Sequence, residues 1–478
     1  MLSTGVLLSM PRKIPRSVVL WLIVALCAIA TGVPVRAQPV GAAKTLQRVT
    51  DPVIVSGKDL PQLIGKDIAH IRVFAFRNGK AVAIPFQIDQ RDSSGQWVWD
   101  VVYRKRFAFI DEEIAVPRKW EPATSGRGTS DDEDPVGTAL LDANDVLVFM
   151  AEDVGDYSEA PRTGIDAPLI LSLEVSDSLN GTRGWVYVAY YPASPPPLSK
   201  IRYMKYNAEQ KTVQSPIYSF HFSDQHMALI HNLQVNKVTI VDRVKIEGEV
   251  TLSMPIPGQK LRFDEDDIQG HTEGYIAGPV RIVKRNIARL SLAGGLLNAP
   301  EVTCDNFYYP HHAEIPVCLS TGFPVKQIQM TLTTDYRNPP FDRLYMGRAR
   351  QLDATPGVTP SLQARLRRLG TEWIVLDGDQ ASLINLVVVP DSVEGRARAQ
   401  PCLCSDKEKP VHTHIVPGTR TETGFLITSS ADCPKGEHIL YGHYLISAQP
   451  YEPGDEYAAF GMQNNKLTTR VSPVWPAH

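Results

Sequence analysis

Proline and glycine are spread so densely through this chain of 478 residues that long helices have little room. The sequence contains 37 prolines and 33 glycines, and a proline inside a helix removes a hydrogen bond and clashes with the preceding turn. Between these residues lie short apolar or alternating runs, which are typical of β-strands bounded by turns. We therefore expect a mostly β protein. The clearest runs in the first part of the chain are Val53–Ser56, Ile71–Phe76, Ala81–Ile88, Val146–Met150, Leu169–Val175 and Trp185–Tyr191.

Longer strands are expected in the second part of the chain. They are predicted at Ile217–Ile230, Lys237–Leu252, Tyr275–Val283 and Ile328–Thr334. Ser361–Leu369 has leucines at helical spacing, and Lys284–Leu297, which Gly294 and Gly295 interrupt, is a second helical candidate. We expect both to be connectors on a β scaffold. Asp377-Gly378 predicts a hairpin turn between two later strands.

The order of these elements predicts two packed β-sandwich-like domains with a small cysteine-containing C-terminal region. Short strands with regular turn signals favour sandwiches over alternating strand–helix units. Pro195-Pro196-Pro197 is a stiff, extended spacer and marks a domain boundary. We expect a signal peptide at 1–37, an N-terminal β-sandwich-like domain at 38–195, a central β domain at 200–355 and a C-terminal β region at 356–478.

The segment 1–37 has the pattern of a cleavable secretory signal. Basic residues precede an apolar run from Val18 to Ala30, and small residues lead to Ala37. The run is shorter than the roughly 20 residues of a membrane-spanning helix, and an uncleaved N-terminal anchor is the alternative. We expect an exported protein, periplasmic or extracellular, without a transmembrane helix after signal cleavage.

The charge balance argues against nucleic acid as a partner. The formal net charge is −3, and removal of 1–37, which carries four basic and no acidic residues, makes it more negative. Proteins that bind nucleic acid carry a basic patch. With 43% hydrophobic and 21% charged residues, the composition is that of a globular protein. The sequence contains no phosphate-binding glycine fingerprint, nucleophile elbow or HExxH pattern.

Two groups of polar residues at strand ends are candidate cation sites. Asp89 and Asp92 lie where one predicted strand turns, and Asp142, Asn144 and Asp145 precede another. Oxygen ligands that converge from such loops suit calcium, although the spacing is not that of an EF-hand. The alternative is an Asx turn at each strand end, in which the carboxylate bonds to the backbone of its own loop.

Three stretches of this chain resemble a known group of exported proteins. IPFQID at 84–89, the nearby DxxG, and LDANDVLVFMAEDVGD at 141–156 are similar to secreted, largely uncharacterised bacterial β proteins. These are grouped loosely with rhamnogalacturonan-lyase-like and galactose-mutarotase-like supersandwich proteins. The later run Gly278-Pro279-Val280-Arg281-Ile282 is similar to the same group, so the resemblance covers Val53–Arg285. It implies a β-rich exported fold and a link to glycans, and it carries no catalytic residue onto this sequence.

Histidine, tyrosine and arginine define a candidate catalytic site. His226 lies in a histidine-rich stretch, and Tyr275 and Arg281 follow the acidic run Asp264–Asp267. An arginine that holds a uronate carboxylate, with a base that takes the neighbouring proton, would suit a polysaccharide lyase. This hypothesis requires His226, Tyr275 and Arg281 to converge in one cleft. The alternatives are half-buried strand residues and a solvated acidic loop.

Five of the six cysteines follow the signal segment and can oxidise outside the cytoplasm. Cys304 and Cys318 are close in sequence, and we expect a disulfide that closes a short loop. Cys433 is expected to pair with Cys402 or Cys404, which leaves one thiol over.

The alternative for the C-terminal cysteines is a metal site. Cys402 and Cys404 are two residues apart, as are His412 and His414. Alternate residues of an extended segment share one face, and thiolates with imidazoles suit zinc or copper. In this interpretation Cys402, Cys404, His412 and His414 are the ligands.

Three functional hypotheses follow from the sequence. The first is an exported β-sandwich protein that binds a ligand or partner at the cell envelope, either a glycan or an envelope protein. The second is a carbohydrate-active enzyme, a polysaccharide lyase or hydrolase. The third is an envelope metal-binding protein that uses calcium, zinc or copper. The first requires no catalytic constellation, whereas the second requires the convergent triad and the third a converging set of ligands.

Overall fold

The computed structural model describes the parts of the chain that carry its sheets. The described residues are 42–102, 139–159, 161, 164–223, 230–253, 257–292, 297–322, 324–337, 341, 343–346, 350–353, 373–388, 397–404, 419–429, 433, 435–453, 455, 459 and 466–474. All of the sheets belong to one compact unit, Ala43–His478. Strands predominate, which confirms the mostly β prediction. The predicted signal segment 1–37 and the predicted helix Ser361–Leu369 lie outside the described residues.

Short 3-10 turns connect some of the strands. They are η1 Gly57–Asp59, η2 Pro61–Leu63, η3 Ile68–His70, η4 Ala151–Asp153 and η6 Glu265–Asp267. Turns of this length suit a chain in which proline and glycine interrupt helical runs. Within the described residues, no helix has the length and apolar character needed to span a membrane.

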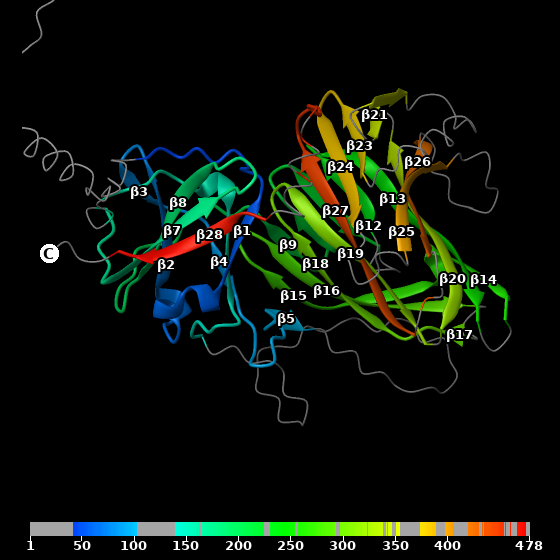
Figure 1. Ribbon diagram of the computed structural model, residues 1–478, viewed down its shortest axis with the longest axis horizontal. Coiled ribbons are helices and arrows are strands. Elements are labelled where there is room, and N and C mark those ends of the chain that lie inside the picture. Colours follow the sequence, from blue (N-terminus) through cyan, green and yellow to red (C-terminus); the bar gives the residue numbers. More distant parts are fainter. Residues whose placement is uncertain are drawn as a thin grey trace, which may run out of the picture. The chain divides into compact units, whose positions relative to one another are not determined.

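Two sheets form the N-terminal sandwich (Figure 1). The first has the order β1-β6-β4 and the second the order β28-β7-β8-β2-β3, and neighbouring strands run antiparallel. The strands are β1 Pro52–Ser56, β2 Ile71–Arg77, β3 Lys80–Ala83, β4 Gln87–Asp89, β6 Val146–Met150, β7 Leu169–Ser176, β8 Arg183–Tyr190 and β28 Thr468–Pro473.

The core of this sandwich lies between its two sheets. Val55 and Phe149 from the smaller sheet belong to one buried cluster with Leu173 and Val188 from the larger. Each is less than 1% exposed. Successive side chains of a strand point to opposite faces, so each strand supplies alternate residues to this core. The predicted apolar runs correspond to β1, β2, β6, β7 and β8, whereas the predicted run Ala81–Ile88 is divided between β3 and β4, and β28 was not predicted.

The first sheet of the large sandwich has nine strands among the described residues. Its order is β25-β26-β20-β13-β12-β11-β10-β9, and β14 pairs with β13 beside this path. The strands are β9 Lys205–Asn207, β10 Thr212–Gln214, β11 Tyr218–Phe222, β12 Ile230–Val235, β13 Val238–Leu252, β14 Lys260–Asp264, β20 Val325–Arg337, β25 Ala397–Cys404 and β26 Thr419–Ser429.

The second sheet of the large sandwich has eleven strands among the described residues. Its order is β22-β21-β23-β24-β27-β19-β18-β16-β15-β5, and β17 pairs with β16 beside this path. The strands are β5 Val101–Val102, β15 Ile268–Ala277, β16 Ile282–Leu292, β17 Leu297–Asn298, β18 Val302–Tyr308, β19 His312–Thr321, β21 Arg343–Met346, β22 Arg350–Asp353, β23 Trp373–Gly378, β24 Ala381–Val388 and β27 Gly436–Ser447.

A single large core joins these two sheets. Phe220, Met330 and Phe425 of the nine-stranded sheet share a buried cluster with Tyr308 and Leu383 of the eleven-stranded sheet. The two sheets therefore pack face to face (Figure 1). The prediction of two packed sandwich-like domains is confirmed.

Strands that follow residue 356 are distributed over three sheets. β23, β24 and β27 join the eleven-stranded sheet, β25 and β26 join the nine-stranded sheet, and β28 joins the N-terminal sandwich. Strand pairing depends on residues far apart in the chain, and the sequence reveals only the order of the strands. The division into 38–195, 200–355 and 356–478 stays a prediction about domains.

The helix predicted at Lys284–Leu297 is wrong, because most of this segment belongs to strand β16. Ile282 lies in the core of the large sandwich, whereas Val283 packs against Trp97 on the other side of the sheet. Both residues are fully buried. Within the segment predicted as a helix, the core-facing positions Lys284 and Asn286 are polar but buried, so the alternation of apolar and polar residues that marks a strand is obscured.

The single strand predicted at Tyr275–Val283 is interrupted by a turn. β15 ends at Ala277 and β16 begins at Ile282. The backbone N–H of Gly278 donates to the carbonyl of Arg281 across this turn, at 3.2 Å. The proline between them has no N–H to contribute to a ladder, which fits its position in the turn.

The hairpin predicted at Asp377-Gly378 is confirmed. β23 and β24 pair antiparallel as far as Gly378 and Ala381, which leaves two residues for the turn. Asp377 and Gly378 themselves belong to β23, and the turn is formed by Asp379 and Gln380, so the Asp-Gly signal predicted the hairpin but not the position of its turn.

Candidate functional site

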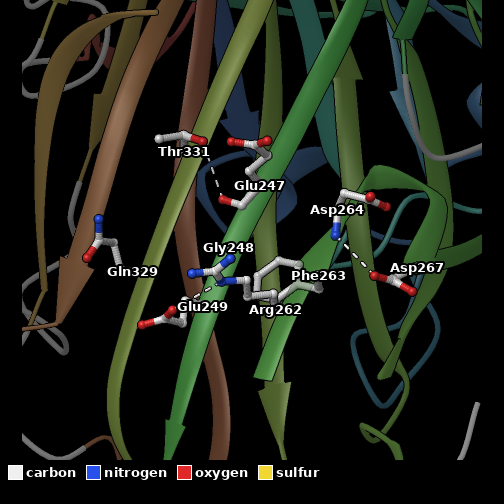
Figure 2. Close-up of a pocket in the computed structure, with 9 residues that line it drawn as sticks. All are labelled: Glu247, Gly248, Glu249, Arg262, Phe263, Asp264, Asp267, Gln329 and Thr331. Atoms are coloured by element: carbon white, nitrogen blue, oxygen red, sulfur yellow. Dashed lines mark hydrogen bonds and ion pairs between the residues drawn. The ribbon is translucent and has the colours of Figure 1, made fainter. Parts of the chain in front are cut away.

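The candidate site is a groove on the nine-stranded sheet with a volume of about 430 Å³, within the range of small-molecule sites. Figure 2 shows its lining residues, which come from β13, β14, β20 and the turn after β14. We call it the polar groove. It is lined by Glu247, Gly248, Glu249, Arg262, Phe263, Asp264, Asp267, Gln329 and Thr331.

The alternation of β13 places acidic side chains in the polar groove. Ile246 and Val250 belong to the core of the large sandwich, so Glu247 and Glu249, at the positions between, point to the other face. β20 follows the same pattern and faces these carboxylates with amide and hydroxyl groups. Its register pairs Gln329 with Glu249 and Thr331 with Glu247.

A glycine and an aromatic ring lie beneath the polar groove, on the core side of the sheet. Gly248 lies opposite Phe263 in the β13–β14 pairing, and both are on the core side. A Cβ at Gly248 would lie 2.1 Å from Cζ of Phe263. The ring therefore occupies the space of the missing side chain, and a larger residue at position 248 would displace it.

One carboxylate in the polar groove is neutralised by two cations. Nζ of Lys260 lies 2.6 Å from Oε1 of Glu249, and Nε of Arg262 lies 3.4 Å from its Oε2. The hydrogen bond from Lys260 and the charges of both cations lower the pKa of Glu249. Glu249 is therefore ionised at neutral pH, with Arg262 held beside it.

The acidic run Asp264–Asp267 forms one wall of the polar groove as a capped 3-10 turn. Oδ1 of Asp264 accepts from the backbone N–H of Asp266 at 2.9 Å, and Oδ2 of Asp267 accepts from that of Asp264 at 3.1 Å. Glu265 turns inward, where its Oε2 accepts from the N–H of Ile246 at 3.2 Å. These bonds hold the wall in a fixed position, as a capping box does at a helix start.

The polar groove therefore presents hydrogen-bonding groups of both kinds on a rigid sheet. Carboxylates accept hydrogen bonds, a guanidinium donates them, and an amide or a hydroxyl does both. Oγ1 of Thr331 donates to the carbonyl of Glu247 at 3.4 Å (Figure 2), and the hydroxyl oxygen can still accept hydrogen bonds. Such a lining suits a ligand that carries many hydroxyl groups.

Arg281, a predicted catalytic residue, is buried in an ion pair and does not line the polar groove. Its Nε donates to Oδ2 of Asp89 at 2.7 Å, and its Nη1 donates to the hydroxyl of Tyr309 at 3.0 Å. Its guanidinium carbon lies 5.5 Å from the ring centre of Trp97 and 5.3 Å from that of Phe307. Burial alone lowers the pKa of Arg281, but Tyr309 and Asp89 raise it, and the net shift is upward.

Tyr275 lies on the core side of the eleven-stranded sheet. It stands opposite Lys284 in the β15–β16 pairing, and cross-strand partners share a face. Nζ of Lys284 lies over the ring of Phe222, 3.5 Å from its centre, on the core side. Tyr275 itself packs against Tyr206, with ring centres 4.5 Å apart.

Tyr275 and Arg281 therefore do not share a site. Arg281 lies on the side of the sheet where Val283 packs against Trp97, opposite the side of Tyr275. His226 lies outside the described residues. The structure therefore does not bring Tyr275 and Arg281 together in one cleft, because after the turn that precedes β16 the side chain of Arg281 lies on the outer face of the sheet.

The motifs IPFQID and GPVRI meet in the structure. Oε1 of Gln87 accepts from the backbone N–H groups of Val280 and Arg281 at 2.9 and 2.8 Å. Nε2 of Gln87 donates to Oδ1 of Asp89 at 2.7 Å, and Asp89 pairs with Arg281. Asp89, a predicted cation ligand, is thus neutralised by an arginine. These motifs join β4 of the N-terminal sandwich to β16 of the large sandwich.

Asp92 forms an Asx turn. Its Oδ1 accepts from the backbone N–H groups of Ser94 and Gln96 at 2.9 and 2.8 Å. The side chain of Asn144 donates to the carbonyl of Asp92 at 3.2 Å. This is the alternative to a cation site, and the hydrogen bond from the Ser94 hydroxyl lowers the pKa of Asp92.

Asp142 and Asp145 likewise bond to the backbone of nearby loops. Oδ1 of Asp142 accepts from the N–H of Asn144 at 2.7 Å and that of Asp145 at 3.1 Å. Asp145 accepts from Asp142 at 2.9 Å and from Arg91 at 2.8 Å. Across the described part of the chain, no group of three or more His, Cys, Asp or Glu side chains is placed to hold a metal ion.

The short-loop disulfide is confirmed. Cys304 on β18 and Cys318 on β19 are bonded, with their Cα atoms 6.5 Å apart. Cys433 is buried and pairs through its backbone with Val325, and Cys402 is half-buried on β25. The pairing of Cys433 with Cys402 or Cys404 stays a prediction.

The predicted zinc or copper site also stays a prediction. Cys402 and Cys404 lie on β25 opposite Gly424 and Glu422 of β26. His412 and His414 lie outside the described residues.

Sequence reasoning identified one wall of the polar groove and missed the rest. The acidic run Asp264–Asp267 stood out by composition. Glu247 and Glu249 carried an alternation signal, because they interrupt an apolar strand at every second position. Gln329 and Thr331 are about 80 residues away and carry no signal that links them to β13.

No family model matches this chain, and no curated protein sequence matches it. Among solved structures, a glycosyl hydrolase family 38 protein from Enterococcus faecalis aligns over 91% of this chain and 47% of its own, with 6% identity and a TM-score of 0.43. An alpha-mannosidase from Enterococcus faecalis V583 aligns over 91% of this chain and 45% of its own, with 7% identity and a TM-score of 0.43.

A third structure is more distant. An alpha-N-acetylgalactosaminidase from Bifidobacterium bifidum aligns over 53% of this chain and 39% of its own, with 10% identity and a TM-score of 0.33. The chain spans less than half the length of each of the three. None of them is a rhamnogalacturonan lyase or a galactose mutarotase, so that resemblance stays a prediction. Similarity of this extent assigns neither a family nor an activity to the chain.

Proposed function

We propose that this protein is an exported β-sandwich protein that binds a glycan in the polar groove. The observation that carries the proposal is the lining itself, in which carboxylates, an amide, a hydroxyl and a guanidinium converge on one rigid sheet face. A sugar hydroxyl donates one hydrogen bond and accepts others, so it is satisfied by such a mixture. Side chains on strands are also held more precisely than those on loops.

The charge of the polar groove favours a neutral glycan over a uronate-rich one. Four carboxylates line it, from Glu247, Glu249, Asp264 and Asp267, against the single guanidinium of Arg262. That guanidinium and the ammonium of Lys260 beside the groove are both already paired with Glu249, so the other three carboxylates exceed the available cations. A uronate carboxylate would enter a field of like charge, which costs binding energy.

Export is part of the proposal. It is supported by the signal-like pattern of 1–37 and by the Cys304–Cys318 disulfide, since disulfides persist in oxidising compartments. A protein outside the cytoplasm would meet the polysaccharides of a cell envelope or of its surroundings.

Affinity electrophoresis tests this function. The purified protein is run in native gels that contain mannan, xylan, β-glucan or, as the anionic comparison, polygalacturonate. We expect retardation by at least one neutral polysaccharide and none by polygalacturonate at low salt, where charge repulsion is strongest. Migration unchanged in every gel would refute glycan binding, and retardation by polygalacturonate alone would refute the charge argument.

Hydrolysis of the bound glycan is a second candidate, favoured by one feature of the polar groove. Glu247 stands directly opposite Asp264 in the β13–β14 pairing, and cross-strand partners have Cβ atoms about 5 Å apart. Many glycosidases use a pair of carboxylates on one surface, of which one acts as an acid. Release of reducing ends from the retained polysaccharide, abolished in Glu247→Gln, would support catalysis. Stable binding of the polysaccharide without release of reducing ends would contradict hydrolysis and support a binding protein.

A further inference from the structure

The polar face continues beyond the polar groove across five neighbouring strands. Register pairs Arg262 of β14 with Glu249 of β13, Glu249 with Gln329 of β20, Gln329 with Thr428 of β26, and Thr428 with Arg398 of β25. Each pair is directly opposite, so the five side chains form one row perpendicular to the strands. We call it the first row.

A second row runs parallel to the first, two residues further along each strand. Asp264 is paired with Glu247, Glu247 with Thr331, Thr331 with Leu426, and Leu426 with Gln400. Four of these five side chains carry groups that can donate or accept hydrogen bonds, and Leu426 is apolar. The groove residues of both rows lie at one end, on β14, β13 and β20 (Figure 2).

Both rows face away from the core of the large sandwich. The residues between them on the outer strands, Ala399 and Ile427, belong to that core, as does Met330 on β20. Arg398 and Gln329 are exposed, and Thr428 and Gln400 are half-buried. The side chains of both rows therefore have accessible surface.

We propose that the polar groove is one end of an extended binding track, and that its ligand is a linear oligosaccharide lying across β14, β13, β20, β26 and β25. The proposal rests on the glycan-binding function above and names the class of glycan. Four strand spacings of about 4.8 Å give the track a length of about 19 Å. Hydrogen-bonding groups repeat along it at each strand, so a chain of several sugars would meet a new pair at every step.

The same geometry disfavours a peptide as the occupant. A peptide strand adds to a free sheet edge and runs along the strands, whereas the track crosses the strands, and its three middle strands, β13, β20 and β26, are each paired on both sides. An amphipathic helix needs an apolar groove, and Leu426 is the apolar member of the two rows. Hydroxyl-rich chains match this surface better, because polar groups face the ligand at nearly every position.

Isothermal titration calorimetry with manno-, xylo- and cello-oligosaccharides of increasing length tests the track. We expect affinity to rise about tenfold or more from disaccharide to hexasaccharide in the preferred series. The double variant Arg398→Ala/Gln400→Ala removes side chains at the β25 end only. It is expected to weaken hexasaccharide binding about tenfold and to leave disaccharide binding unchanged, because a disaccharide occupies the polar groove alone.

Two controls keep the result unambiguous. Glu437→Gln changes an exposed residue on β27 of the other sheet and should leave both affinities unchanged. Thermal unfolding of the double variant should match the wild type, since both side chains point outward. Affinity that stops rising at the disaccharide, with no effect of the β25 variant, would overturn the track and leave the polar groove standing. Absence of binding to every oligosaccharide and polysaccharide would overturn both.

Discussion

At the scale of single residues, the pair formed by Arg281 and Asp89 explains two motifs that the sequence made prominent. Their side chains are 3% and 1% exposed, and they are joined at 2.7 Å. Gln87 donates a further hydrogen bond to Asp89, and the hydroxyl of Tyr309 accepts one from Arg281. A buried charge without its partner is costly, so each residue requires the other. This mutual requirement concerns the stability of the fold, and it explains the presence of both residues without a catalytic role.

Asp89→Asn should therefore destabilise the protein strongly. We expect the free energy of unfolding to fall by about 3–5 kcal/mol, because the guanidinium of Arg281 would stay buried without its counter-charge. Urea-induced unfolding followed by fluorescence measures it. Asp59→Asn, at an exposed position in η1, is the matched control and should change stability little. Equal effects of the two substitutions would contradict the account.

Lys284 makes stability depend on pH. Burial, with a contribution from Lys211, lowers its pKa from 10.5 to about 7. Between pH 7 and pH 10.5 the unfolded chain therefore binds a proton that the folded chain does not. Stability rises with pH across this window, by up to about 1.4 kcal/mol per pH unit from this group, and its contribution is lowest below pH 7.

Lys284→Met should abolish this rise. Methionine fills a similar volume without a titratable group, so the difference in unfolding free energy between pH 7 and pH 9 should shrink relative to wild type. Denaturant unfolding at both pH values measures the effect. A wild-type protein whose stability falls between pH 7 and pH 9, with Lys284→Met behaving identically, would show that Lys284 does not titrate there.

At the scale of elements, local pattern predicted strands well where one face is solvated or the run is short and buried. Val146–Met150 was predicted with the bounds of β6, and Val53–Ser56 with those of β1 to within one residue. β16 was mistaken for a helix because two core-facing positions of the segment, Lys284 and Asn286, carry polar side chains that are nonetheless buried. A pattern of apolar and polar residues reports which face is buried, and it fails where polar residues occupy the buried face.

The C-terminal strand β28 shows what pattern cannot give. It pairs with β7 from Thr468 to Pro473, about 290 residues away in the chain, and Oγ1 of Thr468 lies 2.9 Å from Oγ of Ser176. Val471 packs against the core of the N-terminal sandwich. Nothing near β28 in the sequence identifies β7 as its partner, because the pairing energy comes from residues that are remote until the chain folds.

Truncation after Lys466 should expose β7 as an edge strand. We expect a lower melting temperature and increased self-association, since an uncovered apolar edge invites pairing with another chain. Thermal unfolding with light scattering measures both. Val471→Ala, which keeps the strand and removes one packing contact, should lower the melting temperature less and leave the protein monodisperse. A truncated protein that behaves like the wild type would show that β28 contributes little.

At the scale of the whole molecule, the groove illustrates how far a sequence predicts a site. The acidic run Asp264–Asp267 was conspicuous, but its placement beside Gln329 depends on β13 lying between β14 and β20. That order follows from the packing of two large sheets around one core. Tyr275 and Arg281, which were predicted to converge, lie on opposite faces of their sheet, because the turn between β15 and β16 separates them.

Export should be visible in the mass of the protein. If 1–37 is a cleaved signal, protein recovered from outside the cytoplasm should begin at Gln38 and carry Cys304 and Cys318 as a disulfide. Intact mass before and after reduction and alkylation measures both. Protein that retains 1–37, or that has both of these thiols reduced, would contradict the export proposal.

The central claim is glycan binding in the polar groove, and titration calorimetry of groove variants tests it most directly. The titrant is whichever neutral polysaccharide retards the protein in gels, and the proteins are wild type, Glu247→Gln/Gln329→Ala and Glu301→Gln. Glu301 is exposed and does not line the groove. We predict at least a tenfold loss of affinity in the groove variant, about 1.4 kcal/mol, and no change in Glu301→Gln. Equal affinities in all three proteins would contradict the claim and place any glycan site elsewhere.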